Sequence, residues 1–342
     1  SSFIKLFLKN KYIMLNISFK NGQGLGNQLW MFAAAKSISE KLNIELNIFE
    51  FSKFKGRDFL ILDNKNNYDN SIKEYKFSEN IEIFNERFFY DKDLQYIASD
   101  YDERVLEIKN NIILEGLFQS ENYFFGNLKK LQRYVKLKKN IKNENKIDEN
   151  VCLLNIRGGE YKRHKNFILP QSYWLNAIEN YKKKFFINKF MIVTDDYIYA
   201  KKLFPKLEVI HGDIGRCYAS LFNSSNLILS NSTFSYFPCK TGVSKRVIAP
   251  LYWARPSNKL KRWASPCNIY EGWMWQDQKS NLFSYDECLK IAKKTSEYYK
   301  KQYTVLIKPQ DVPNNNIFKF LPKNIKIIIK RLLSFFLPKH FG

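Results

Sequence analysis

An arginine followed by two glycines comes directly after an apolar run of the chain. Arg157 follows residues 151–156, which read as a buried strand, and Gly158, Gly159 and Glu160 come next. A guanidinium held at the end of a strand can bind two phosphate oxygens and stabilise the charge of a departing diphosphate, and Glu160 could orient it. The alternative is a solvated arginine, which is the commoner case for a loop arginine taken alone.

Two more polar groups follow apolar runs in the same half of the chain. Thr194, Asp195 and Asp196 stand between an apolar run and a helical pattern. One carboxylate could simply cap the helix, and the other could accept hydrogen bonds from ribose hydroxyls or a nucleobase. The second group lies at a strand-to-helix junction, where hydroxyls and helix N–H groups bind anions; it comprises Asn231, Ser232, Thr233, Phe234 and Ser235. Ordinary capping would need only one of its hydroxyls.

A glycine-rich turn lies near the start of the sequence. Gly24, Gly26, Asn27 and Gln28 belong to it. Such a turn between a strand and a helix lets the backbone approach a ligand and directs helix N–H groups at it. Because the G-x-G-x-G spacing differs from the dinucleotide-binding fingerprint, a plain tight turn is the alternative.

These polar segments need strands and helices to position them. In the first half, the apolar pattern predicts strands over residues 12–19, 44–49 and 112–117 and a helix over 28–42. Residues 51–107 read as irregular, and 129–150 as a helix followed by a solvated linker. This pattern opens like a doubly wound α/β domain.

The second half alternates more regularly. We predict strands over residues 151–156, 190–193, 207–210, 227–229 and 247–249, with helices over 172–181, 197–203 and 214–222 and from Phe234. Ser172 is the expected cap of the first of these helices. Alternation at this spacing predicts a parallel sheet, and ligands of such sheets bind at the carboxyl ends of the strands.

The composition suits a globular protein of two domains. The chain has 342 residues, of which 45% are hydrophobic and 16% aromatic. Its formal net charge of +23 favours anionic partners, although solvated basic faces are an alternative. Five scattered cysteines without a C-x-x-C pair, together with three histidines, predict buried, reduced thiols in a cytosolic protein and no histidine-rich metal centre.

Two other functions stay open at this point. Asp91 and Asp93 form a D-x-D segment in a predicted loop, as metal-dependent sugar transferases of GT-A type use; sensitivity to chelators would reveal that chemistry. The +23 charge and 21 tyrosines would suit a nucleic-acid-binding module, but no RNP pattern or zinc cluster accompanies them. Salt-sensitive RNA binding without nucleotide-sugar binding would favour that function.

The segment 317–340 is basic and amphipathic. Apolar residues recur in it at helical spacing, and its basic residues, with no acidic one among them, are Lys319, Lys323, Lys326, Lys330, Arg331 and Lys339. This pattern predicts a helix that lies on an anionic membrane. The alternative is a C-terminal helix that packs on the protein with its basic face in water.

Six ordered segments together resemble the bacterial α-1,2-fucosyltransferases of glycosyltransferase family 11. The segments are G-L-G-N-Q-L at 24–29, G-L-F-Q-S-E-N-Y at 116–123, R-G-G-E-Y at 157–161, T-D-D at 194–196, N-S-T-F-S-Y at 231–236 and I-A-P-L-Y-W at 248–253. The resemblance covers roughly residues 12–255. Six ordered matches are far more specific than any one of them.

The resemblance implies an α/β fold of GT-B type, with two Rossmann-like domains facing a central cleft. With the solvated linker before residue 150 as the boundary, residues 1–148 would form the acceptor-side domain and residues 149–300 the nucleotide-sugar-binding domain, and the basic amphipathic pattern assigns residues 301–342 to a tail. The implied activity is inverting transfer of L-fucose from GDP-β-L-fucose, without a metal or other cofactor, to a cell-surface glycan such as lipooligosaccharide, O-antigen or capsule. The acceptor could be lipid-linked. The tail would hold the enzyme at the inner face of the cytoplasmic membrane, and nucleic acid is not an expected partner.

The resemblance also implies roles for individual residues. Arg157 would contact the diphosphate, and Arg157 and Glu160 are the catalytic candidates. The implied donor-binding set is Gly24, Gly26, Asn27, Gln28, Asn155, Arg157, Thr194, Asp195, Asp196, Asn231, Ser232, Thr233, Phe234 and Ser235. The implied acceptor-side set is Gln119, Glu121 and Tyr123. Glu121 and Glu160 are the candidates for the general base.

The chain departs from the family pattern H-x-R-R-G-D-Y at three positions. Asn155 replaces the histidine, Gly158 the second arginine and Glu160 the aspartate, and Tyr236 and Phe237 replace a pair of tryptophans. Asn155 can still form a hydrogen bond to a guanine edge. A nucleotide-sugar donor is therefore expected, whereas a sugar related to fucose stays an alternative.

Overall fold

The first half of the chain forms a five-stranded sheet. The structure is a computed structural model, and it describes residues 13–74, 81–91, 96–163, 167–251 and 267–302. The sheet order is β4-β2-β1-β8-β5, and the strands pair in parallel. Its main elements are β1 (Met14–Ser18), α1 (Leu25–Leu42), β2 (Glu45–Phe49), β4 (Asn66–Asn67), β5 (Glu82–Asn85) and β8 (Ile112–Glu115). The predicted strand–turn–helix–strand opening is confirmed.

The prediction of an irregular stretch over 51–107 is wrong in its middle. That stretch supplies two strands of the sheet, β4 and β5, and further short elements: η2 (Phe51–Lys53), β3 (Leu60–Leu62), β6 (Phe88–Asp91), β7 (Tyr96–Ser99) and η3 (Glu103–Glu107). These strands have two to four residues each, and the side chains of β5 are mostly exposed. Such strands carry too few alternating apolar positions to be visible in the sequence. Asp91 therefore ends a strand and does not lie in a loop, and Asp93 lies outside the described residues.

The connection between the halves is more ordered than a helix and a linker. It contains η4 (Glu121–Phe124), α3 (Lys130–Tyr134), β9 (Val135–Leu137) and α4 (Lys139–Glu144). Strand β9 pairs antiparallel with β3, which ties the connection back to the first half. The exposed residues that follow α4 lead directly into the second sheet.

The second half forms a seven-stranded sheet in the order β12-β11-β10-β13-β14-β15-β16. All neighbours are parallel except β15 and β16. Numbered along this half, the first six strands have the Rossmann order 3-2-1-4-5-6. The strands are β10 (Val151–Ile156), β11 (Lys189–Thr194), β12 (Glu208–Ile210), β13 (Asn226–Leu229), β14 (Arg246–Pro250), β15 (Met274–Gln276) and β16 (Leu282–Phe283). The predicted parallel sheet is confirmed.

The helices of this half are α5 (Gln171–Phe185), α6 (Tyr197–Leu203), α7 (Ile214–Phe222) and α8 (Tyr236–Thr241), with the short turns η5 (Gly159–Arg163) and η6 (Thr233–Ser235). The prediction that Ser172 caps α5 is wrong, because Pro170 is the N-cap and no side chain bonds there. Proline at this point already has the fixed φ that a helix start needs. Each predicted polar segment nevertheless lies directly after a strand of the sheet.

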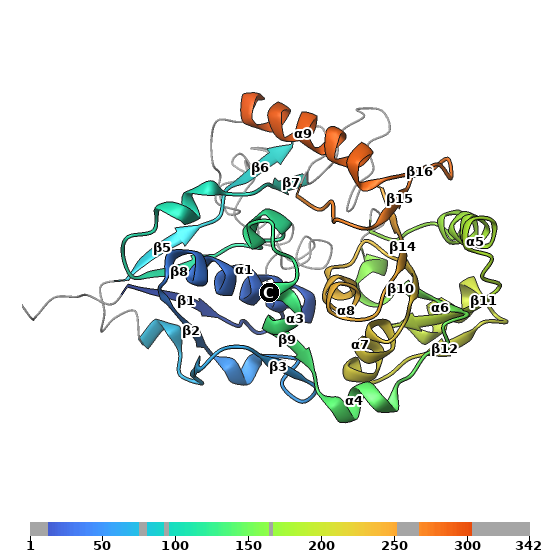
Figure 1. The fold of residues 1–342 in the computed structure, drawn as a ribbon, viewed down its shortest axis with the longest axis horizontal. Helices are drawn as coiled ribbons and strands as arrows, with labels where there is room; N and C mark the ends of the chain where they lie inside the picture. Colours follow the sequence, from blue (N-terminus) through green and yellow to red (C-terminus); the bar gives the residue numbers. More distant parts are fainter. Residues whose placement is uncertain (1–12, 75–80, 92–95, 164–166, 252–266, 303–342) are drawn as a thin grey trace, which may run out of the picture.

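The two sheets form Rossmann-like domains whose carboxyl edges meet, which confirms the predicted α/β fold of GT-B type. Helix α1 contacts η6 and α8 across this interface, and Figure 1 shows α1, α3 and α8 between the two sheets. Trp30 of α1 packs on Tyr236, Phe237 and Tyr270 of the second half, with ring centroids 4.1 to 5.6 Å apart. One hydrophobic cluster therefore runs through both domains.

The last described helix, α9 (Tyr285–Gln302), returns to the first half. Tyr299 stacks on Phe89 of β6, and the Ser296 hydroxyl bonds to Asp100, so α9 covers the antiparallel pair of strands β6 and β7 (Figure 1). Among the described helices, none is long and apolar enough to cross a membrane. The predicted amphipathic segment 317–340 lies outside the described residues. All five cysteines are buried and free, as predicted.

Candidate functional site

Arg157 lies at the point where the order of the second sheet reverses. Strand β10 is central, with β11 on one side and β13 on the other. The carboxyl edge between β10 and β13 is the topological switch point at which open α/β sheets bind their ligands. Arg157 follows β10, Asp195 follows β11 and Ser230 follows β13. The fold therefore gathers the three predicted polar segments of this half at one edge.

Asp195 is the carboxylate that contacts Arg157. Its Oδ2 lies 3.2 Å from Nη2 of the arginine, and its Oδ1 accepts a hydrogen bond of 2.9 Å from the Gly158 amide. A Cβ on Gly159 would lie 2.6 Å from Asp195 Oδ2, so the loop needs glycine there. Glu160, which we expected to orient the arginine, is exposed at the surface. The prediction was wrong because Asp195 comes from a neighbouring strand, which local sequence does not reveal.

Aromatic rings flank the same guanidinium. Its central carbon lies 5.6 Å from the ring centroid of Tyr161 and 5.9 Å from that of Phe234. Burial raises the pKa of Tyr161, although the positive charge of Arg157 acts against this. The Tyr161 hydroxyl donates to the backbone carbonyl of Asn231 at 3.3 Å. Arg157 is thus fixed by one carboxylate and two rings while a quarter of its side chain stays exposed.

Several buried polar atoms at this edge have no hydrogen-bond partner among the described residues. They are Oδ1 of Asn155, Nε of Arg157, Oγ of Ser230 and Oδ1 of Asn231. Asn155 and Asn231 are otherwise held by their amide nitrogens, which donate to the carbonyls of Val193 and Phe167. A buried polar atom without a partner costs free energy of about 1–3 kcal/mol. Four of the unpartnered atoms among the described residues therefore gather at the carboxyl ends of two neighbouring strands, β10 and β13.

Asp196 and Thr194 hold the start of α6. The Asp196 carboxylate accepts from the Tyr199 amide at 3.0 Å and forms an ion pair with Lys162. Burial acts to raise the pKa of Asp196, but the hydrogen bonds from Lys162 and Tyr199 outweigh it and the pKa is lowered. The Thr194 hydroxyl accepts from the Asp196 amide. Asp196 is therefore the capping carboxylate that the sequence allowed for. The nucleoside prediction required one of the two carboxylates to be free of protein partners. In this structure both Asp195 and Asp196 have such partners.

The hydroxyl-bearing segment of residues 231–235 faces the other domain. Ser232 caps η6 by accepting from the Phe234 amide, and the Ser235 hydroxyl donates to the Ser232 carbonyl. Thr233 donates to Asn27 Oδ1 at 2.9 Å, and Gln119 Nε2 donates to the same oxygen at 3.0 Å. Asn27 thus joins three of the predicted segments in one contact.

The glycine-rich turn of residues 24–28 packs against the segment of residues 231–235. Gly24 is the exposed N-cap of α1, while a Cβ on Gly26 would lie 2.5 Å from the Thr233 backbone. Gln28 is buried, and its side-chain amide bonds to the backbone of Lys53 and Lys55 at 2.9 Å each. Gly26 and Gln28 therefore hold the domain interface and a neighbouring loop in this structure.

Glu121 links the two domains. Its Oε1 accepts from the Tyr236 hydroxyl at 2.8 Å and lies 2.7 Å from Lys240 Nζ, and its Oε2 accepts from the Glu271 amide at 2.8 Å. Burial, followed by the negative charge of Glu121, raises the pKa of Tyr236. A carboxylate with three donors is poorly suited to remove a proton from an acceptor sugar. This arrangement leaves Glu160 as the remaining candidate for the base.

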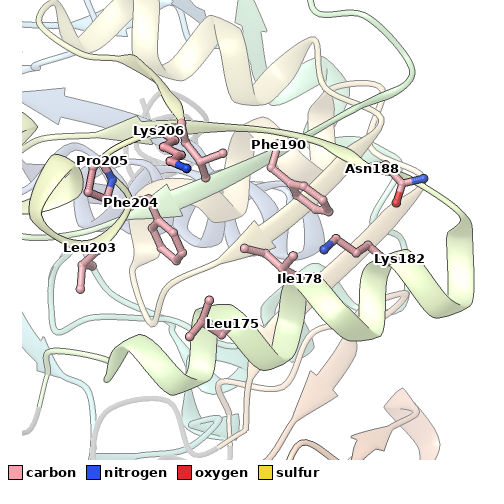
Figure 2. Close-up of a pocket in the computed structure, with 10 residues that line it drawn as sticks. Leu175, Ile178, Lys182, Asn188, Phe190, Leu203, Phe204, Pro205 and Lys206 are labelled. Carbon is pink, nitrogen blue, oxygen red and sulfur yellow. The ribbon is translucent and has the colours of Figure 1, made fainter.

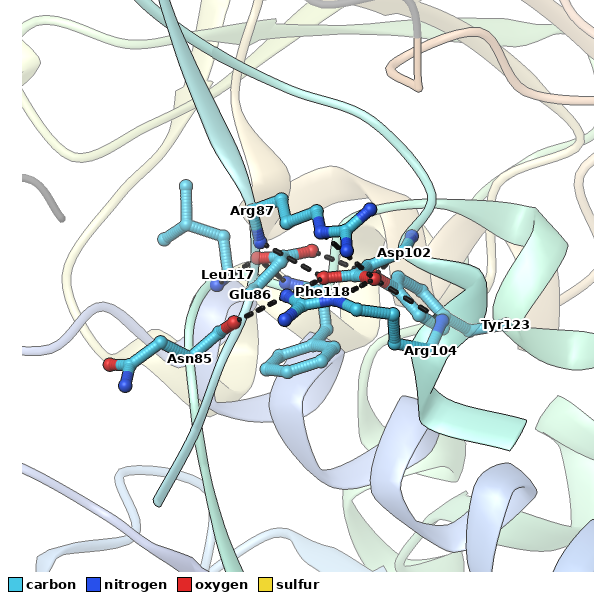
Figure 3. Close-up of polar contacts among 8 residues, drawn as sticks. All are labelled: Asn85, Glu86, Arg87, Asp102, Arg104, Leu117, Phe118 and Tyr123. Atoms are coloured by element: carbon cyan, nitrogen blue, oxygen red, sulfur yellow. Dashed lines mark hydrogen bonds and ion pairs between the residues drawn. The ribbon is translucent and has the colours of Figure 1, made fainter. Parts of the chain in front are cut away.

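Glu86 supports the segment that carries Gln119 and Glu121, and it is not among the residues predicted from the sequence. Its carboxyl group accepts from the Leu117 and Phe118 amides at 2.6 and 2.8 Å and from the Tyr123 hydroxyl at 3.0 Å. Figure 3 shows this cluster beside Asp102, which binds Arg104. Burial raises the pKa of Glu86 to about 7. Tyr123 thus belongs to a buried support, and Glu86 went unnoticed because it lies in the stretch that read as irregular.

Comparisons with known proteins find distant structural likeness alone. No family model matches the chain, and the search of curated proteins finds no match. The glycosyl transferase family 9 protein from Veillonella parvula is 11% identical with a TM-score of 0.45, covering 85% of this chain and 99% of its own. The NodZ α-1,6-fucosyltransferase soaked with GDP-fucose is 12% identical with a TM-score of 0.40, covering 68% and 93%. A variant of Arabidopsis thaliana FUT1 in complex with GDP is 11% identical with a TM-score of 0.43, covering 75% and 74%. The chain is similar to these proteins at a level that assigns neither family nor activity.

Proposed function

We propose that the protein is a glycosyltransferase that takes a nucleotide-sugar donor at the carboxyl edge of its second sheet. One observation carries the proposal: the buried, unpartnered polar atoms of Asn155, Arg157, Ser230 and Asn231 at the switch point of a Rossmann-ordered sheet. Both donors and acceptors are present in this set, which suits a nucleotide with its base, hydroxyls and phosphates. The GT-A alternative is not favoured, because the chain has two Rossmann-like sheets.

Within this proposal, Arg157 stabilises the leaving diphosphate. Asp195 holds one edge of the Arg157 guanidinium, and Nε of Arg157 has no partner among the described residues. That nitrogen can donate to a phosphate oxygen without breaking the Asp195 contact. A charge fixed before the reaction stabilises the transition state without a cost of reorganisation. We propose direct inverting displacement with oxocarbenium character, in which no metal ion or other cofactor is needed.

The donor we propose is GDP-β-L-fucose. Asn155 Oδ1 is a buried acceptor, and guanine offers adjacent N–H donors at N1 and N2 to such an oxygen, whereas the base edge of uracil offers a single one at N3. The acceptor we propose is a cell-surface glycan that could be lipid-linked, bound on the side of Gln119. The place of action would be the cytoplasmic face of the membrane. These finer statements rest on the family resemblance of the six segments.

A nucleotide panel tests the site directly. We expect calorimetry and thermal shift with GDP, UDP, CDP and their sugars to show the tightest binding for GDP. The melting temperature reports binding because a ligand that binds only the native state raises it. Arg157→Ala should weaken binding of the diphosphates and lower turnover by about two to three orders of magnitude. Arg163→Ala is the matched control, since Arg163 is exposed on the same turn, η5. UDP as the tightest ligand would overturn the donor, and failure of every nucleotide to bind would overturn the function.

A further inference from the structure

An apolar groove lies on the outer side of the second domain, between α5 and the end of α6. Its cavity volume is about 410 Å³, which falls within the range of sites for small molecules. Figure 2 shows the side chains that converge on it, of which the apolar ones include Leu175, Ile178, Phe190, Leu203 and Phe204. Leu175 is 48% exposed. The groove therefore presents apolar surface that the described chain does not cover.

The turn beside the groove exposes an aromatic ring under backbone strain. Phe186 follows α5 with φ of 58°, in the left-handed region that glycine or asparagine normally occupies at a helix end. Its side chain is 82% exposed. A bulky residue at positive φ costs conformational energy, and a ring in water regains little of it by packing. The fold alone does not explain phenylalanine at this position.

The rim of the groove is basic. Lys182, Lys183 and Lys184 form the last turn of α5, and Lys189 and Lys206 stand on the neighbouring segments. Lys182 forms an ion pair with Glu179 one turn earlier in α5. Three successive lysines point in different directions around a helix, because successive residues are about 100° apart. Their charge is therefore spread around the turn and does not form one row.

The groove and the candidate site lie at opposite edges of the same sheet. Lys189 and Phe190 begin β11, whereas Asp195 follows its end. A partner that occupies the groove therefore leaves Arg157 and its neighbours accessible.

We propose that this groove, Phe186 and the lysine turn form a docking surface for an anionic lipid bilayer. Exposed aromatic and apolar side chains enter the interface, and each lysine near an anionic surface strengthens binding. A fluid layer of phosphate headgroups can satisfy lysines that point in several directions, whereas an acidic protein would need carboxylates at matching fixed positions. The chain's own segment 317–340 is a poor occupant, because it is basic and would face a basic rim.

The test uses the full chain and vesicles of phosphatidylcholine with or without phosphatidylglycerol. We expect the binding constant for the anionic vesicles, measured by co-sedimentation, to fall about 30-fold in Lys183→Gln/Lys184→Gln, since each lysine contributes about a factor of five. Phe186→Asn should also weaken it several-fold while leaving the melting temperature unchanged or higher, because asparagine tolerates positive φ.

Matched controls separate this surface from general charge. Lys300→Gln/Lys301→Gln removes the same charge from the last turn of α9, and Ile198→Ala shortens another apolar residue that is 80% exposed; neither should change sedimentation. Equal losses in test and control variants would overturn the proposal, as would unchanged binding of the test variants. Binding of soluble poly-glutamate that depends on Lys183 and Lys184, without vesicle binding, would also overturn it and assign the face to an acidic protein. Nucleotide binding reports on the proposed activity separately.

Discussion

Replacing Asp195 with asparagine isolates the contact that fixes Arg157. The substitution keeps the shape of the side chain but removes its charge. If the amide oxygen still accepts from the Gly158 amide, the amide nitrogen faces Nη2 of Arg157, so two donors meet where an ion pair of 3.2 Å had been. If the amide rotates, Gly158 loses its acceptor. One of the two contacts is lost in either case.

The expected loss can be worked from the geometry. Two unit charges at 3.2 Å in an effective dielectric of about 20 attract by roughly 5 kcal/mol before desolvation. The two side chains are 25% and 27% exposed, so solvent screens part of this attraction. Hydrogen bonds to charged groups contribute about 1.5–3 kcal/mol net. A loss of about 2 kcal/mol in transition-state stabilisation corresponds to a fall of about 30-fold in kcat/KM.

The assay is donor turnover by Asp195→Asn, Arg157→Ala and the double variant, with Asp213→Asn as a control. Asp213 caps α7 by accepting from the Arg216 amide at 2.9 Å, and asparagine caps a helix about as well, so this variant should leave turnover unchanged. If Asp195 acts through Arg157, the double variant should turn over as slowly as Arg157→Ala and no slower. A double variant slower by the product of both losses would refute this reasoning and give Asp195 a contact of its own with the donor.

Three further predictions concern the supports of the site. Burial raises the pKa of Glu86 from its usual 4.5 to about 7, so the folded state holds a proton that the unfolded state releases, and stability should fall as the pH rises from about 4.5 to 7. Glu86→Gln should flatten that dependence in melting curves recorded across this range; an unchanged slope would contradict the assignment. Gly26→Ala should destabilise the protein by roughly 1–3 kcal/mol, because its Cβ would lie 2.5 Å from the Thr233 backbone, whereas Gly24→Ala meets nothing within 4 Å and should cost less. Equal melting temperatures for these two variants would show that the interface yields. Turnover should persist in EDTA because the proposed mechanism assigns stabilisation of the leaving diphosphate to Arg157 and not to a cation; loss with rescue by Mn²⁺ would restore the metal-dependent alternative.

Sequence patterns predicted the second domain much better than the first. Strand β10 and helices α6 and α7 have the predicted bounds, because buried parallel strands and amphipathic helices give long, regular apolar signals. Strands β4 and β5 were missed because pairing with β2 and β8, and not their own apolar pattern, holds them in the sheet. The return of α9 to the first domain was also missed, since a contact such as that between Phe89 and Tyr299 leaves no mark on local spacing.

The candidate site shows the same division between local and long-range information. The sequence placed Arg157 and residues 231–235 at strand ends, as the structure has them. It did not reveal that Asp195, 38 positions away, holds Arg157 in place of nearby Glu160. Sequence reasoning also assigned Glu121 and Gly26 to ligand binding, whereas their contacts join the domains. Residues that recur at strand ends can serve a ligand or a neighbouring domain, and only the tertiary contacts distinguish these roles.

The aromatic contact of Trp30 with Tyr236 and Tyr270 has a consequence for folding. These three rings are fully buried, and they belong to one hydrophobic cluster that includes Leu15 of β1 and Leu153 of β10. Opening the interface would expose them to water, at a cost of about 25 cal/mol for each Å² of apolar surface. The larger core cluster is therefore shared by the two halves, although a second cluster lies within the second half alone. The two sheets should melt in a single cooperative transition, and a cut in the exposed connection after α4 should leave two fragments that stay together and lose their shape when separated.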